Sequence, residues 1–417
     1  MTETLPGGIE DLLRDLAPQV LGTLVRRFGD FDTAEDALQE AMLAAATQWP
    51  AEGLPDNPRG WLIQVAQRRM ADAVRAEVAR RRRETTVFER DVPDTEAVDW
   101  DDTLAMFFLC CHPALSSASA IALTLRAVGG LGTAEIASAF LLPEATMAQR
   151  ITRAKKKLAT LDRPFARPGD AQWHERLGSV LHVLYLIFNE GHTTTLGPDL
   201  QRTDLSGEAI RLTRSIHRLL PDNTEVTGLL ALMLLTDSRR AARTGTHGEL
   251  IPLIEQNRAL WDRELITEGI TLTTGTLASG LTGPYQIQSA IAAVHAQARR
   301  AEDTDWIRIL ALYNMIERIS KNPMVTLNRA VATAMVHGPA AGLELANTLD
   351  DELAGNHRLD AVRGHLHEMA GDFDAAVTCY SSAANRTTST PERDYLAIRA
   401  AQLRRHRTPS APHPTDP

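Results

Sequence analysis

Apolar residues recur every three or four positions along almost the whole chain, and no segment sustains the alternation of apolar and polar residues that is typical of a strand. A spacing of three and four places apolar side chains on one face of a helix. The pattern therefore predicts an all-α protein built from amphipathic helices.

One predicted helix begins at Asp32, with a capping-box pattern from Thr33 to Asp36, and ends at Trp49–Pro50. Its inward stripe contains Ala34, Ala37, Leu38, Ala41 and Ala45. Its outward face carries Glu35 with Gln39, and Asp36 with Glu40. This acidic face is either simply solvated or a docking surface for a basic partner. The basic helix that follows favours docking.

That second helix covers residues 57–83, and residues 68–83 carry seven arginines against two acidic residues, a balance of about +5. Its buried face is expected to hold Leu62, Val65, Ala66, Met70 and Val74, and its other face Gln64, Arg68, Ala71 and Arg75. Charge runs are usually solvated helix ends. However, Trp61 shares a face with Gln64 and Arg68, and such a surface can hold unpaired bases as well as phosphates.

Residues 84–102 contain eight acidic residues, one arginine and a proline, which predicts an acidic linker. Residues 103–163 then form a predicted helical module with a helix-turn-helix: a short helix from Thr133 to Phe140, a turn at 141–143, and a helix from Glu144 to Leu158 with Pro143 at its first position. The second helix would enter the major groove. Its candidates are Glu144, Thr146, Met147 and Arg150 for bases, and Gln149, Arg153, Lys155, Lys156 and Lys157 for bases or phosphates.

Residues 168–405 form a long helical remainder. Within it, a segment beginning at Gly338 and one beginning at Gly371 are related after 33 residues, close to the tetratricopeptide period of about 34. The pattern predicts stacked helix pairs. Residues 406–417 are rich in proline and are expected to be a disordered tail.

Length and charge refine this description. A chain of 417 residues predicts two or three domains, and its net charge of −9 makes the basic segments local patches. Cys110, Cys111 and Cys379 cannot build a disulfide framework. The chain starts without an export signal, and its apolar runs are too short to cross a bilayer. We expect a soluble, cytoplasmic protein that makes no membrane contact.

The sequence offers no enzyme chemistry. It contains no Walker-type phosphate loop, nucleophile elbow or zinc-type pattern of cysteine and histidine. Glu190 and His192 lack further metal ligands at a suitable spacing. We therefore expect no catalysis, no metal and no cofactor.

Four segments in order resemble bacterial RNA polymerase sigma factors of the extracytoplasmic-function group: Ala34-Glu-Asp-Ala-Leu-Gln-Glu-Ala, Asn57-Pro-Arg-Gly-Trp-Leu-Ile-Gln-Val-Ala, Ala122-Leu-Thr-Leu-Arg-Ala-Val-Gly-Gly and Pro143-Glu-Ala-Thr-Met-Ala-Gln-Arg. The remainder resembles the tetratricopeptide-like extension of one branch, through Phe188-Asn-Glu-Gly-His, Gln256-Asn-Arg-Ala-Leu-Trp-Asp-Arg and Asn328-Arg-Ala-Val-Ala. The chain departs from that branch at His192, where relatives commonly have an aromatic residue, and at Asn257, where they commonly have an acidic one.

The resemblance implies sigma region 2 at residues 8–83 and sigma region 4 at residues 103–163. It implies that the polymerase clamp binds Asp32, Glu35, Asp36, Gln39 and Glu40. The −10 promoter element would meet Asn57, Arg59, Trp61, Gln64, Arg68, Arg69 and Arg75, and the −35 element would meet the candidates of the second helix-turn-helix helix, Glu144 to Lys157. The linker would thread toward the active centre of the polymerase.

The implied partners are core RNA polymerase, through its clamp and flap, and promoter DNA. A regulatory protein is a further candidate, and the free chain is expected to be monomeric. The motif residues of the extension are Asn189, Glu190, Gly191, His192, Gln256, Trp261, Asn328 and Arg329. They are either caps and salt bridges of a helical array or part of a surface through which residues 168–405 modulate activity. The alternative function is a helix-turn-helix regulator that senses a ligand or partner and works without core polymerase.

Overall fold

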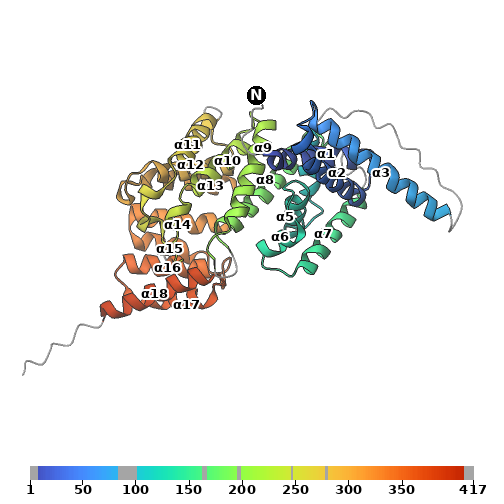
Figure 1. Cartoon of the computed structure of the whole chain (residues 1–417). Helices are drawn as coiled ribbons and strands as arrows, with labels where there is room; N and C mark the ends of the chain where they lie inside the picture. Colours follow the sequence, from blue (N-terminus) through green and yellow to red (C-terminus); the bar gives the residue numbers. More distant parts are fainter. Residues whose placement is uncertain are drawn as a thin grey trace, which may run out of the picture. The chain divides into compact units, whose positions relative to one another are not determined.

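A computed structural model of the chain describes residues 8–82, 101–161, 167–194, 199–245, 248–277 and 280–407, without the side chains of residues 72–82, 171, 406 and 407 (Figure 1). Within these ranges the regular elements are all helices, and Thr244 and Leu250 form an isolated bridge. The predicted all-α class is confirmed. The chain divides into two compact units, Met1–Ile187 and Phe188–Pro417. This division falls within α8 (Asp170–His192), whereas the sequence placed the start of the second part at residue 168.

The first unit contains seven complete helices among the described residues: α1 (Gly8–Phe28), α2 (Phe31–Glu52), α3 (Pro58–Arg82), α4 (Asp102–Cys110), α5 (Ser117–Ala127), α6 (Thr133–Ala139) and α7 (Glu144–Ala159). Helices α1, α2 and α3 pack on one another, and α4 packs against α1 and α5. Every residue of α4 is buried. Helix α7 packs on α5 and α6. Because α4 touches both groups, it joins them into one compact body.

Helix α2 buries the predicted stripe, but its ends differ from the prediction. It begins at Phe31 because the side chain of Asp30 accepts a hydrogen bond from the backbone N–H of Thr33 at 3.2 Å. It continues through Pro50 to Glu52 and ends at Gly53, whose φ is 88° and whose N–H donates to the carbonyl of Trp49 at 3.0 Å. The helix therefore ends at the glycine, which accepts a positive φ at little cost, rather than at the proline.

The apolar face of α3 follows the prediction, with Leu62, Ala66 and Met70 buried and Val65 half-buried. The helix-turn-helix is also present, as α6, a turn and α7. Leu141 in the turn has a φ of 51°. Pro143 is the N-cap of α7 rather than its first residue.

The second unit is an array of helices: α9 (Thr203–Leu219), α10 (Thr224–Asp237), α11 (Arg263–Leu277), α12 (Pro284–Gln297), α13 (Trp306–Ile319), α14 (Pro323–His337), α15 (Pro339–Asn347), α16 (His357–Met369), α17 (Phe373–Arg386) and α18 (Thr390–Arg407). Short 3-10 helices lie at η1 (Arg240–Ala242), η2 (Leu253–Glu255), η3 (Arg258–Leu260) and η4 (Ala301–Asp303). From α12 onward each helix packs on the next (Figure 1). Gly338 lies between α14 and α15, and Gly371 precedes α17. The predicted stacking of helix pairs is confirmed.

Helix α12 is capped by a residue distant in sequence. The carboxylate of Glu225 on α10 accepts hydrogen bonds from the backbone N–H groups of Tyr285 and Gln286, at 3.2 and 3.0 Å. Burial raises the pKa of Glu225, and these two hydrogen bonds oppose the rise. A Cβ atom at Gly228 would lie 2.6 Å from the backbone nitrogen of Gln286, so glycine permits this close approach of α10 to α12.

Candidate nucleic-acid interface

The outward face of α2 is acidic over one turn. Asp36, Gln39 and Glu40 are exposed, and the carboxylate of Glu40 lies 3.0 Å from the Nε of Arg69 on α3. Both members of this pair are more than half exposed, so the pair contributes little to stability. The carboxylate of Asp36 and the amide of Gln39 remain open to a partner.

Glu35, in contrast, does not face solvent. Only 7% of the residue is exposed, because its carboxylate accepts hydrogen bonds from the guanidinium of Arg126 on α5 and the ammonium of Lys155 on α7. The prediction of an outward-facing Glu35 is therefore wrong. The sequence register alone could not reveal two partners that lie 91 and 120 residues away.

Lys155 is held from several sides. Its ammonium donates to Asp32 at 2.7 Å as well as to Glu35, and it lies 5.2 Å from the ring centroid of Phe31. Burial by itself lowers the pKa of Lys155, but the hydrogen bonds to Asp32 and Glu35 outweigh it, so the pKa is raised. Asp32 and Glu35 were predicted to bind a protein and Lys155 to bind DNA. Here these residues bind one another.

The exposed face of α3 presents Gln64 and Arg68 to solvent. Trp61 is half-buried, with its ring centroid 5.5 Å from that of Trp49 in an edge-on arrangement. Asn57 caps the helix, since its side-chain oxygen accepts from the N–H of Gly60 at 2.9 Å. The side chain of Arg75 lies outside the described residues. The structure thus places a polar and aromatic surface at the first turns of α3.

Arg59, at the start of α3, forms an ion pair with the buried Asp102. Its guanidinium donates to the carboxylate of Asp102 at 2.9 Å, and Arg26 of α1 lies 2.8 Å from the other oxygen of that carboxylate. Thr23 also donates to Asp102, at 2.7 Å. Asp102, which the predicted linker included, is the first residue of α4 and is buried. Residues 84–100 of that linker lie outside the described residues.

The N-terminal turns of α7 are open to solvent, and so is much of the outer face. Exposed side chains here are Glu144, Thr146, Gln149, Arg153, Lys156 and Lys157, and Arg150 is half-buried. Met147 is fully buried, so its prediction as a base-reading residue is wrong. It belongs to the inner stripe with Ile151, Ala154 and Leu158. The accessible surface that remains can read bases and contact phosphates.

In the second unit, the Asn189–His192 segment forms the last turn of α8. Gly191 lies against the start of α9: a Cβ atom there would lie 2.3 Å from the backbone nitrogen of Ser206. His192 stacks on Phe188, with 5.5 Å between ring centroids. Burial, and then the nearby Arg243, lower the pKa of His192 well below its usual value. These contacts give the motif a packing role.

The other motif residues also hold the array together. The side-chain amide of Gln256 donates to the carbonyl of Ile251 at 3.1 Å, and Trp261 is buried. Arg329 forms an ion pair with Glu317 at 2.6 Å, and Asn328 beside it is exposed. Asn257, where the chain departs from the resembled branch, caps η3. Of the motif residues, Asn328 is exposed to solvent.

The structure also identifies residues that the sequence did not single out. Arg126 is the only charged residue of α5, and its guanidinium is largely buried against Glu35 of α2. Among the described residues no group of three or more histidine, cysteine, aspartate or glutamate residues could hold a metal ion. None of the described helices is long and apolar enough to cross a membrane.

Comparison with known proteins agrees with this arrangement. Residues 12–80 match the family model Sigma-70 region 2, and residues 108–158 match Sigma-70, region 4. Residues 176–276 match a family of unknown function (DUF6596). An uncharacterised protein of Rhizobium meliloti (strain 1021), R00370, is 40% identical over 416 residues, and the match covers 97% of each chain. The similarity therefore extends over both units.

Proposed function

The chain belongs to the sigma-70 family of RNA polymerase sigma factors, in the extracytoplasmic-function group, and we propose that it binds core RNA polymerase through α2 and engages promoter DNA through α3 and α7. Promoter recognition is the function of the two matched regions. The observation that carries the finer proposal is the exposed acidic row on α2, a helix that packs against α3 and pairs with it through Glu40 and Arg69.

The acidic row suits a basic protein surface. Asp36, Gln39 and Glu40 lie within about one turn of α2, and among the described residues no buried ion pair holds them. Charge of one sign on a protein surface mainly sets the rate and specificity of association. We assign these three residues to the polymerase contact. Asp32 and Glu35 would join that contact only after they have released Lys155.

The start of α3 suits unpaired bases. Trp61 offers an aromatic ring, and Gln64 and Arg68 offer hydrogen-bond donors on the accessible surface next to it. Stacking on such side chains stabilises each captured base by about 1–3 kcal/mol, which offsets the cost of unstacking the duplex. In this proposal Arg59 keeps α3 in place through Asp102 rather than contacting DNA.

Helix α7 is the proposed reader of the −35 element. Its exposed first turn, with Glu144, Thr146 and Gln149, would face base edges, while Arg153 and Lys156 would contact phosphates. Lys155 cannot contact phosphate while Asp32 and Glu35 hold its ammonium. Full use of α2 and α7 therefore requires that they separate.

The second unit is the proposed modulator of this step. Its stacked helix pairs build the kind of extended surface that binds partners in other repeat proteins. The matched family of unknown function, at residues 176–276, gives it no assigned activity. The proposal is that the state of this unit changes promoter-dependent transcription.

Core-dependent transcription tests the central proposal. The full-length chain is mixed with core RNA polymerase and a library of promoter fragments, and the transcripts are sequenced. Asp36→Arg reverses a charge on the exposed row, and Glu52→Arg is the matched control at the exposed far end of the same helix. We expect Asp36→Arg to lose core binding and transcription and Glu52→Arg to keep both. Duplex binding without any core dependence of transcription would instead support the helix-turn-helix regulator.

A further inference from the structure

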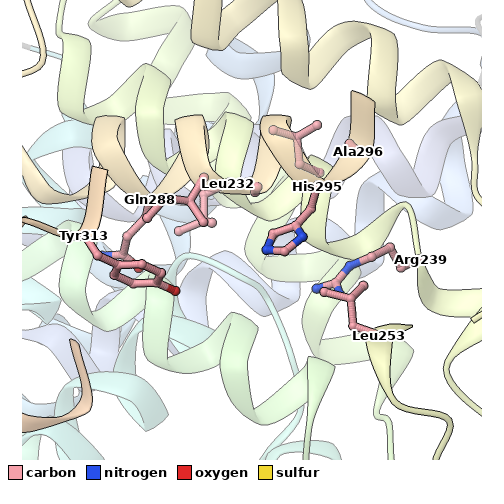
Figure 2. Close-up of a pocket in the computed structure, with 10 residues that line it drawn as sticks. Leu232, Arg239, Leu253, Gln288, His295, Ala296 and Tyr313 are labelled. Carbon is pink, nitrogen blue, oxygen red and sulfur yellow. The ribbon is translucent and has the colours of Figure 1, made fainter. Parts of the chain in front are cut away.

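The second unit contains a cavity of about 230 Å³ between α10, η2, α12 and α13 (Figure 2). Most of its wall is apolar, formed by Leu232, Leu235, Leu253, Ile291, Ala292 and Ala296. The polar lining consists of Arg239, Gln288, His295 and Tyr313. A cavity with an apolar wall and a few converging polar groups has the character of a small-molecule site.

Arg239 gives the cavity its charge. Among the described residues, no side chain or carbonyl forms an ion pair or hydrogen bond with its guanidinium, although the group is partly buried. Burial, and then the nearby Arg258, lower the pKa of Arg239 to about 10, so the group still carries its charge at neutral pH. A partly buried cation without a counter-ion is costly unless a bound anion compensates it.

Among the described residues, no acidic group acts on Arg239 to supply such an anion. The neighbouring cation, Arg258, has partners of its own, since it donates to the carbonyls of His295 and Ala298 at 2.7 Å and lies 4.6 Å from the ring centroid of Trp261. Burial, and then Arg239 and Arg258, lower the pKa of His295 to about 4, which keeps the imidazole neutral. Burial lowers the pKa of Arg258, and Glu302 and Asp303 on η4 oppose that shift, but neither acidic residue is among the groups that affect Arg239.

The geometry matches one class of ligand. In Figure 2 the His295 ring lies between Tyr313 on one side and Arg239 on the other, so the cationic group lies at one end of a largely apolar space. A guanidinium binds a carboxylate through two parallel hydrogen bonds. We propose that this cavity binds a small organic carboxylate, with the carboxylate on Arg239 and an apolar body between α10, η2 and α12.

The ligand class follows from the balance of charge. One guanidinium balances the single negative charge of a carboxylate, whereas a phosphate dianion would keep an unbalanced charge in a largely apolar cavity. The apolar wall requires a hydrocarbon body as well. The proposal goes beyond the proposed function, because binding is measured without polymerase or DNA and either idea can fail alone.

The test uses the full-length chain and three probes: benzoate, its neutral analogue benzamide, and inorganic phosphate. Binding is followed by ligand-observed NMR and by the shift of the melting temperature. We expect saturable binding of benzoate and none of benzamide or phosphate. Arg239→Gln should weaken benzoate binding about tenfold or more, and Arg318→Gln, an exposed arginine on α13, should leave it unchanged.

A second variant keeps the test independent of charge. Ala292→Phe fills the cavity and keeps Arg239, and it should also abolish benzoate binding while circular dichroism stays that of the wild type. Absence of benzoate binding by the wild type overturns the proposal. So does equal binding of benzamide, binding that survives in both cavity variants, or a preference for phosphate that depends on Arg239.

Discussion

Glu35 of α2 accepts a hydrogen bond from Lys155 of α7, so a residue of the matched region 2 neutralises a residue of the matched region 4. Arg126 completes the cluster from α5. One carboxylate thus connects α2 to both α5 and α7. In the free chain, this connection therefore holds together α2 and α7, the two helices proposed to bind polymerase and promoter DNA.

Removal of the Glu35 charge should destabilise the first unit. Glu35→Gln leaves Arg126 and Lys155 with a weaker partner in a buried place, which costs about 3 kcal/mol by analogy with other broken buried pairs. Urea unfolding measures the loss. Glu40→Gln, which breaks an exposed pair with Arg69, should cost less than about 1 kcal/mol. Equal losses would show that the Glu35 cluster is not energetically special.

The two neighbouring lysines of α7 should differ in DNA binding. Lys156 is exposed, whereas the ammonium of Lys155 is held by two carboxylates. In the free chain, Lys156→Ala should lower the salt slope of duplex binding by about one, and Lys155→Ala should leave it nearly unchanged. Fluorescence anisotropy at a series of salt concentrations measures both slopes. A full change for Lys155→Ala would mean that α7 separates from α2 without a partner.

Arg153 provides a related prediction on the outer face of α7. Its side chain is exposed and is assigned to a phosphate. Arg153→Ala should weaken duplex binding and reduce its salt dependence by a slope of about one. Identical slopes for the variant and the wild type would remove Arg153 from the proposed interface.

Two glycines of α8 make a matched pair. At Gly191 a Cβ atom would clash with the backbone of α9, so Gly191→Ala should destabilise the second unit by about 1–3 kcal/mol. At Gly178 a Cβ atom meets open space, and Gly178→Ala should be neutral or stabilising by up to about 1 kcal/mol. Thermal unfolding measures both. If the second unit modulates transcription, only Gly191→Ala should alter it.

The second unit should lose stability in mild acid through His295. Its pKa is about 4 in the folded chain against 6.5 for the free side chain, because burial, Arg239 and Arg258 disfavour the charged ring. The neutral ring therefore makes its full contribution to the free energy of unfolding above about pH 6.5, and this contribution is lost as the pH falls toward 4. Between about pH 7.5 and 5, the wild type should lose about 2 kcal/mol more than His295→Gln. Hydrogen exchange in α12 measures the difference.

Local pattern predicted the helices well and the partners of charged residues poorly. The spacing of Ala34, Ala37, Leu38 and Ala41 gave the buried stripe of α2 correctly, because that stripe depends only on helical register. Glu35 lies at the border of the stripe, and its burial depends on cations from distant helices. Met147 is a different kind of error: its spacing to Ile151, Ala154 and Leu158 already indicated the buried face.

The cavity in the second unit was beyond the reach of local pattern. Its lining comes from α10, η2, α12 and α13, which the fold brings together from more than eighty residues of chain. The arginines of residues 239–243 resemble any surface charge run in the sequence. Only the packing shows that Arg239 has no counter-ion among the described residues, while Arg240 has one in Asp237.

The cap that Glu225 provides for α12 constrains the order in which the second unit can assemble. The N–H groups of Tyr285 and Gln286 bond to a carboxylate sixty residues earlier in the chain, so the first turn of α12 lacks this cap until α10 has docked. A fragment that begins after α10 would leave the N–H groups of Tyr285 and Gln286 without this acceptor. During synthesis the ribosome releases α10 first, and the later helix therefore completes its first turn on an existing template.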